Sequence, residues 1–318
     1  FILAGLSPRL VYFSKELKQY SADVFFAALV FFLVERQLRR QGQGGWLPFT
    51  LLLAVGLGYS HPLVFIIAAV APVLWWGLPQ ARKTIVAVFG ALGVGFLGSY
   101  WLFFRGQVDP ELLIYWRAAF PDLTGGTQVL YWLGAAWSRY VGYFFPGWSA
   151  PGCAVLLLGG LVLAGRSSRP RLIWYFFGPI LMCLAAATAQ RYPFMGPAGG
   201  VRLMMFSAPM LYLLTGAGIG AIFQWLWSAP APGPRGQVES SGSEPALVWR
   251  WLGTLVLLGG VFLWLQPAKL WRENLHPQMN REEIKPLVRF LETHRRPGEV
   301  LYVYYFAKDP FKFYYQGP

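Results

Sequence analysis

The sequence predicts an all-α polytopic membrane protein, with about eight transmembrane helices and the stub of another, interfacial helices, and a small α/β extracytoplasmic portion at the C-terminal end. Three observations support this fold class. Of the 318 residues, 56% are hydrophobic and only 13% are charged, which is too apolar for a soluble domain. Apolar runs long enough to cross a bilayer recur along the chain, and arginine-rich loops follow several of them.

The chain begins within an apolar run, at Phe1 rather than Met. We therefore expect a fragment whose residues 1–6 end an earlier membrane helix. A polar stretch, residues 9–23, is followed by apolar residues to Val34, which are expected to complete the next span. Residues 36–40 then contain three arginines, which predicts that this end of the span is cytoplasmic.

One face of this N-terminal helix carries Glu16, Tyr20 and Asp23, at positions i, i+4 and i+7. Ionisable groups in or beside a membrane span are costly, and they commonly mark a functional site. Glu16 and Asp23 are therefore the candidate carboxylates, and Asp23 is the deeper of the two. The structural alternative for Glu16 is an ion pair with Lys15 or Lys18 among the lipid headgroups.

Residues 46–78 are apolar but too long for one crossing, because a bilayer needs about 20 helical residues. The sequence Gly58-Tyr59-Ser60-His61-Pro62 interrupts them and predicts two short helices or a re-entrant hairpin. His61 is a candidate substrate-binding residue at this break, or else it hydrogen-bonds a backbone carbonyl there. Further spans are expected at residues 84–104, 150–164, 172–188, 202–227 and 248–265.

The segments between and after these spans differ in composition. Residues 105–148 are crowded with aromatic side chains and are expected to form extracytoplasmic helices in the headgroup layer, like a lid on the membrane. Residues 228–247, rich in Pro, Gly and Ser, are expected to be a cytoplasmic linker. Residues 266–318 are expected to begin a truncated extracytoplasmic α/β domain, with an amphipathic helix at 284–291 and a buried strand at 300–306.

Charge and residue types narrow the partners and cofactors. The 27 basic and 14 acidic residues give a charge of +13, which suits membrane lipids or a phosphate-bearing substrate. No RNA-binding signature is present, so a nucleic acid partner is not expected. Cys153 and Cys183 lie in apolar runs and no two histidines have ligand spacing, so neither a disulfide framework nor a divalent metal cofactor is expected.

Several short motifs follow one another along the chain. They are Ser7-Pro8 with Tyr12–Ser21, Tyr59–Pro62, Tyr192–Phe194 with Gly199–Arg202, Arg281–Pro286, and Gly298–Tyr305. As an ordered set they resemble motifs of the GT-C glycosyltransferases, in the branch similar to protein O-mannosyltransferases and lipid A aminoarabinose transferases. The sequence departs from that pattern at Lys15, where Gln is usual, and at Pro62, where an aromatic residue is usual.

The resemblance implies a multi-pass enzyme of the plasma (inner) membrane, with its active face and C-terminal domain extracytoplasmic. Such enzymes take a sugar from a polyprenyl-phosphate carrier, here the expected donor, and transfer it to an acceptor that the sequence does not identify. In the family the catalytic acid lies in the first outer loop. That loop would precede Phe1, so we expect it to be absent from this chain.

Sugar transfer from a lipid phosphate needs a carboxylate for the acceptor, cations for the leaving phosphate and a pocket without bulk water. Glu16 and Asp23 are the candidate catalytic residues. The candidate substrate-binding residues are Lys15, Tyr20, His61, Arg191, Tyr192 and Arg202. The structural alternatives are that Arg202 snorkels to the outer interface and that Tyr192 anchors the chain there.

Two other functions remain open from the sequence. A non-catalytic structural or accessory subunit would keep the same scaffold and bind a partner in a membrane complex. A lipid or solute transporter predicts an internal repeat, and the sequence contains none that we recognise. An acidic residue in the first outer loop would favour the enzyme over the subunit.

Overall fold

The computed structural model describes residues 7, 10–11, 19–105, 110–122, 125–165, 171–196, 200–228, 243–266, 284–296, 298–303 and 308–315. Lys15 and Glu16 therefore lie outside the described residues. The chain divides into two compact units, Phe1–Leu265 and Gln266–Pro318. That the polar, extracytoplasmic part of the chain begins at residue 266 stays a prediction.

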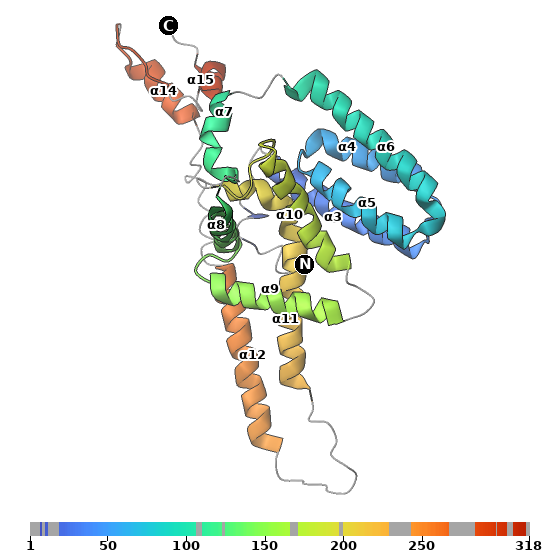
Figure 1. The fold of residues 1–318 in the computed structure, drawn as a ribbon. Helices are drawn as coiled ribbons and strands as arrows, with labels where there is room; N and C mark the ends of the chain where they lie inside the picture. Colours follow the sequence, from blue (N-terminus) through green and yellow to red (C-terminus); the bar gives the residue numbers. More distant parts are fainter. Residues whose placement is uncertain are drawn as a thin grey trace, which may run out of the picture. The chain divides into compact units, whose positions relative to one another are not determined.

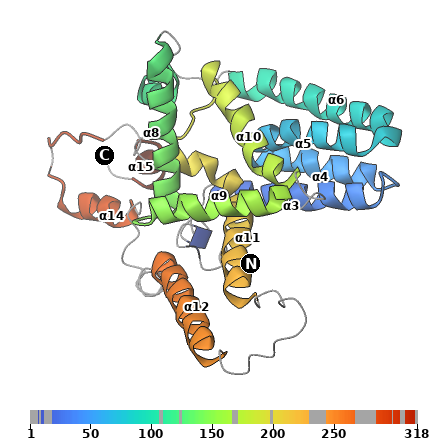
Figure 2. The same cartoon turned by 60° about the horizontal axis from the view of Figure 1, so that its bottom comes forward.

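Four helices fill the first part of the larger unit: α3 (Tyr20–Arg39), α4 (Trp46–Tyr59), α5 (Leu63–Gly77) and α6 (Arg82–Ser99). They lie side by side in both views of the fold (Figures 1 and 2). The tight turn from α3 to α4 includes Gly44 and Gly45, both with φ of 74°, a left-handed conformation that glycine adopts without strain. Helix α4 ends and α5 begins on either side of Ser60–Pro62, which confirms the predicted break.

The larger unit continues with short helices and then longer ones. The elements are η1 (Pro79–Ala81), the π-helical turn η2 (Tyr100–Phe104), α7 (Pro110–Tyr115), η4 (Arg117–Ala119), α8 (Gly126–Phe144), α9 (Ser149–Gly165), α10 (Arg171–Thr188), η5 (Gly200–Ser207), α11 (Ala208–Trp227) and α12 (Ser243–Leu265). Most expected spans therefore correspond to helices with closely matching ends. The region expected to hold interfacial helices contains α7, η4 and α8.

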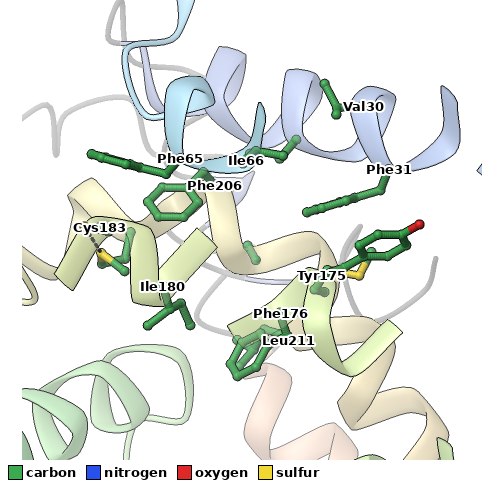
Figure 3. Packing of buried hydrophobic residues seen from close by; sticks show 14 of the residues in the cluster. Val30, Phe31, Phe65, Ile66, Tyr175, Phe176, Ile180, Cys183, Phe206 and Leu211 are labelled. Carbon is green, nitrogen blue, oxygen red and sulfur yellow. Dashed lines mark hydrogen bonds between the residues drawn. The ribbon is translucent and has the colours of Figure 1, made fainter. Parts of the chain in front are cut away.

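The core of the larger unit lies where α3, α5, α10, η5 and α11 meet (Figure 3). Phe31 of α3 stacks on Tyr175 of α10, with ring centroids 5.0 Å apart. Phe65 of α5 contacts Phe206 of η5 in the same core, with ring centroids 6.2 Å apart. All four side chains are at most 9% exposed, so segments far apart in the sequence share one apolar interior.

An ion pair joins one end of α3 to the start of α10. Arg171 donates two hydrogen bonds to the Glu35 carboxylate, at 2.6 and 3.0 Å, and the Tyr175 hydroxyl donates a third at 3.0 Å. Partial burial favours the neutral acid, but the hydrogen bonds and the charge of Arg171 outweigh it and lower the pKa of Glu35. The bidentate geometry makes this a defined link between the two helices.

Helices α9 and α11 form the most extensive helix pair, and α9 runs across α11 in both views (Figures 1 and 2). Their backbones touch at two glycines. A Cβ atom built on Gly159 would lie 1.9 Å from the Leu214 carbonyl oxygen, and one on Gly218 would lie 2.1 Å from that of Val155. Side chains at these positions would prevent the approach.

Four described helical segments are long and apolar enough to cross a membrane: Pro79–Leu102, Arg171–Thr188, Gly200–Trp227 and Val248–Leu265. Helices α8 and α9 together meet the same criteria, but they are bent by 95° at their junction. Helices α4 and α5 are apolar but shorter, and α3 carries acidic residues at both ends of its apolar centre. The structure is that of a helical membrane protein, while the count of about eight spans stays a prediction.

Segments expected on the same side of the membrane do contact one another. Gln80 donates a hydrogen bond to the Gln41 carbonyl at 2.7 Å, between two loops expected to be cytoplasmic. The Phe194 amide donates to the Ala119 carbonyl at 3.0 Å, between two loops expected on the opposite side. These contacts agree with the expected grouping of the loops, whereas the side of the membrane on which each group lies stays a prediction.

The smaller unit contains helices α14 (Lys285–His294) and α15 (Lys308–Tyr314). Helix α14 is the expected amphipathic helix, and Arg295, just after it, donates a hydrogen bond to the Tyr315 hydroxyl at 2.7 Å. The strand predicted for residues 300–306 is not found at 300–303, where Val300 and Tyr302 are 94% and 96% exposed. A strand needs a neighbouring strand to pair with, and none is found among the described residues, so the α/β character is not confirmed.

Candidate functional site

The first turn of α3 buries two of the candidate residues, Tyr20 and Asp23. Asp23 is 1% exposed, and neither carboxylate oxygen has a hydrogen-bond partner among the described residues. Apolar side chains follow it directly, so α3 carries its carboxylate into the core. A buried carboxylate without a partner costs free energy, and proteins commonly keep such a group where a ligand uses it.

The break between α4 and α5 brings Ser60 to the same place. The Ser60 hydroxyl is fully buried and lies close enough to Asp23 to interact with its carboxyl group, yet no hydrogen bond of standard geometry joins them. Helix α4 ends at Tyr59, and the next residue, Ser60, has an extended backbone with φ of −139° and ψ of 100° and a buried side chain. Sequence analysis singled out His61 at this break and missed Ser60.

Arg202 reaches the cluster from the third segment, η5. Its guanidinium carbon lies 5.8 Å from the centre of the Tyr20 ring, a cation–π contact. Its Nε atom is buried and has no hydrogen-bond acceptor among the described residues. The packing of η5 against α3 places this cation and the Asp23 carboxylate around the same tyrosine without pairing them.

Tyr192 holds the chain that leads to Arg202. Its hydroxyl donates a hydrogen bond to the Leu203 carbonyl at 3.2 Å, and its ring packs edge-on against Phe65, with centroids 4.9 Å apart. Burial raises the pKa of Tyr192 well above its ordinary value, and the neighbouring acidic groups of Cys183, Asp23 and Tyr20 raise it further. Tyr192 is thus a neutral, partly buried member of the cluster that fixes the loop against η5.

We call Tyr20, Asp23, Ser60, Tyr192 and Arg202 the polar cluster. Four of its five members were candidate site residues from the sequence. Of the other candidates, His61 is exposed at the break beside Ser60. Arg191 is also exposed and makes only a long contact of 3.5 Å to the Tyr100 hydroxyl, so the structure does not bring it into the cluster.

A second layer supports the loop that carries Tyr192 and Arg202. Arg139 of α8 donates a hydrogen bond from Nε to the Met195 carbonyl at 3.0 Å. Gly200 packs against Trp116, since a Cβ atom there would lie 2.7 Å from the Trp116 ring. Two residues of the aromatic region 105–148 therefore contact the chain that carries Tyr192 and Arg202. Composition alone did not reveal this role.

The arrangement suits a ligand that brings both an acceptor and a donor of hydrogen bonds. The Nε–H of Arg202 can donate to an anionic oxygen, whereas the Asp23 carboxylate can accept from a hydroxyl group. The apolar surroundings strengthen both interactions. Within the described ranges, no group of three or more His, Cys, Asp or Glu side chains could hold a metal ion.

Comparisons with known proteins leave this geometry as the main guide to function. A scan against protein-family models, a search of curated proteins and a search of solved structures each returned no match.

Proposed function

We propose that this chain is an integral membrane glycosyltransferase that transfers a sugar from a polyprenyl-phosphate donor to an extracytoplasmic acceptor. One observation carries the proposal. Three segments far apart in the sequence bring a buried carboxylate, a buried hydroxyl and a buried guanidinium nitrogen together, and none of the three has a hydrogen-bond partner among the described residues. The motif resemblance, which includes Ser60 and Arg202 and has a motif that ends two residues before Asp23, points to the same chemistry.

The transfer reaction requires these three kinds of group. The acceptor hydroxyl oxygen bonds to the anomeric carbon of the sugar while the bond from that carbon to the phosphate oxygen breaks. The bonding electrons leave with the polyprenyl phosphate, and the hydroxyl proton moves to a carboxylate. A cation stabilises the negative charge that grows on the departing phosphate.

In this scheme Asp23 receives or orients the acceptor proton, and Arg202 binds the phosphate. Arginine suits phosphate because its planar guanidinium can donate two parallel hydrogen bonds. Tyr20 holds the guanidinium by its ring face, 5.8 Å from the guanidinium carbon, and Ser60 supplies a neutral hydroxyl beside Asp23. The buried surroundings exclude water, which would otherwise compete with the acceptor.

The test is transfer of radiolabel from a panel of polyprenyl-phosphate sugars by the protein in nanodiscs, with Asp23→Asn and Arg202→Ala alongside. We expect turnover with at least one donor. Asp23→Asn should lower it by about 10²–10⁴-fold, as for loss of a general base, and Arg202→Ala by about 10²–10³-fold, as for loss of a charge-stabilising donor. Arg36→Ala, an exposed arginine at the far end of α3, is the matched control and should transfer like the unmodified protein.

An absence of turnover with every donor, from protein that stays folded, would contradict the proposal. If such protein also co-purified with a partner complex, the accessory-subunit function would replace it.

A further inference from the structure

A groove lined by residues between positions 114 and 132 has no role in the proposed reaction. It has a volume of about 540 Å³, and its lining includes Tyr115, Arg117, Phe120, Asp122, Gln128 and Trp132. We call it the α8 groove, because two of these residues belong to α8 and the others lie just before it. The volume falls in the usual range for small-ligand sites, roughly 300–1,000 Å³.

The lining combines aromatic surface with polar groups of both signs. Trp132 donates its indole N–H to the Ala118 carbonyl at 3.1 Å, which fixes the orientation of its ring. Arg117, Asp122 and Gln128 are exposed at the groove and offer both donors and acceptors. Opposite charges on Arg117 and Asp122 leave the groove without net charge, so it favours neither an anion nor a cation.

These features match the chemistry of a saccharide. A pyranose ring has a face of C–H groups that packs on aromatic rings, and its hydroxyl groups both donate and accept hydrogen bonds. Planar side chains such as those of Asp, Gln and Arg can bind two neighbouring hydroxyls at once. An acyl chain would form no hydrogen bonds with Arg117 or Gln128, and the opposite charges of Arg117 and Asp122 give a phosphate no net attraction.

The groove is also joined to the polar cluster. Phe194, two residues after Tyr192, packs against Trp132 with ring centroids 5.8 Å apart. The Phe194 amide donates to the carbonyl of Ala119, two residues after Arg117 in η4. Phe194 thus lies against the groove residue Trp132. Further along the chain, Gly200, two residues before Arg202, packs against Trp116.

We propose that the α8 groove is a saccharide-binding site. The saccharide class follows from the lining of the groove itself. Its assignment to the acceptor, or to the sugar of the donor, rests on the proposed function.

The test measures saccharide binding by the full chain in nanodiscs, with saturation-transfer NMR as the readout. The free probes are methyl α-mannoside, methyl β-glucoside, N-acetylglucosamine, and di- to tetrasaccharides of glucose and mannose. The lipid probes are polyprenyl-phosphate mannose and polyprenyl phosphate without sugar. Tyr115→Ala and Asp122→Ala remove groove groups, whereas Tyr131→Ala removes an 80% exposed tyrosine of α8 that is not among the groove residues and is the matched control.

We expect at least one sugar probe to bind, and Tyr115→Ala and Asp122→Ala to weaken that binding about tenfold, the loss typical of one aromatic contact or ligand hydrogen bond. Tyr131→Ala should leave it unchanged. Binding of free saccharides would identify the acceptor as the source. A loss confined to polyprenyl-phosphate mannose, with polyprenyl phosphate unaffected, would identify the donor sugar.

The proposal is overturned if none of the sugar probes binds, or if the groove variants bind as tightly as Tyr131→Ala. This outcome is separate from failure of the proposed function. Asp23→Asn and Arg202→Ala lie in the polar cluster and should retain binding of free saccharides at the groove, even in a protein that transfers no sugar.

Discussion

At the scale of single residues, the polar cluster holds buried groups that form no hydrogen bond with any described residue. Burying an unpartnered polar group costs roughly 1–3 kcal/mol, and Asp23, Ser60 and Arg202 each contribute such an atom. The protein could have paired Asp23 with Arg202, as it pairs Glu35 with Arg171. No such pair forms between these two described residues, as the proposed ligand site predicts.

Removing the Asp23 charge should therefore raise stability while it lowers function. We expect Asp23→Asn to raise the free energy of unfolding by about 1–2 kcal/mol, because a buried carboxylate without a partner is replaced by a neutral group of similar shape. Thermal unfolding in detergent measures the effect. Glu35→Gln is the contrasting variant, since it removes a paired carboxylate and should lower the unfolding temperature. A lower unfolding temperature for Asp23→Asn would show that the carboxylate has a structural partner.

At the scale of elements, sequence patterns located most helices. Charged and Gly/Pro-rich breaks mark where helices end, so the limits of α4, α5, α9 and α10 lie within about two residues of the expected ones. The crossing of α9 and α11 was not predictable, because glycines that permit a close approach look the same in sequence as glycines facing lipid. Position 300, part of a predicted strand, lies in an exposed segment without regular secondary structure, since β-branched and aromatic residues do not form a strand without a partner.

The α9–α11 crossing can be tested with neighbouring glycines. Gly159→Ala should destabilise the protein by about 2–4 kcal/mol, because its methyl group would force two backbones apart. Gly160→Ala is the matched control, since a Cβ atom there meets nothing within 4 Å. We expect it to leave the unfolding temperature unchanged or slightly higher. Equal effects of the two substitutions, measured by thermal unfolding, would contradict the crossing.

Most residues of the candidate site could be predicted from the sequence, but their convergence in space could not. Asp23 was identified because acids are rare beside membrane spans, and Arg202 because it follows a glycine-rich segment. Their convergence depends on which faces of α3 and η5 meet, and a single sequence does not contain that information. Ser60 carried a weak signal, its place between two apolar runs, and Arg191 was a plausible cation that the fold leaves outside.

At the scale of the whole molecule, the loops of the larger unit are expected to lie on two sides of the membrane. Gln41 and Gln80 share a hydrogen bond and should face one side, while Gln190, in the loop beside the polar cluster, should face the other. All three are exposed, so single cysteines there should react with a membrane-impermeant maleimide. Cys153→Ala and Cys183→Ala provide the cysteine-free background.

In intact cells we expect labelling of the cysteine at position 190 alone, with positions 41 and 80 reacting after the cells are opened. This pattern follows from the arginine-rich loops expected in the cytoplasm. Labelling of positions 80 and 190 from the same side would contradict the arrangement of the loops. Labelling of 41 and 80 in intact cells, with 190 protected, would reverse the orientation.

The most direct test of the central claim is donor binding at the polar cluster, because it does not depend on completing the reaction. Native mass spectrometry of the protein with polyprenyl-phosphate mannose should show a one-to-one complex that survives when other lipids are stripped away. Arg202→Ala should weaken it at least about tenfold, as expected for loss of a charge-assisted hydrogen bond, while Arg36→Ala should not. Equal retention of the donor by both variants would contradict a phosphate site at Arg202, and with it the proposed role of the cluster.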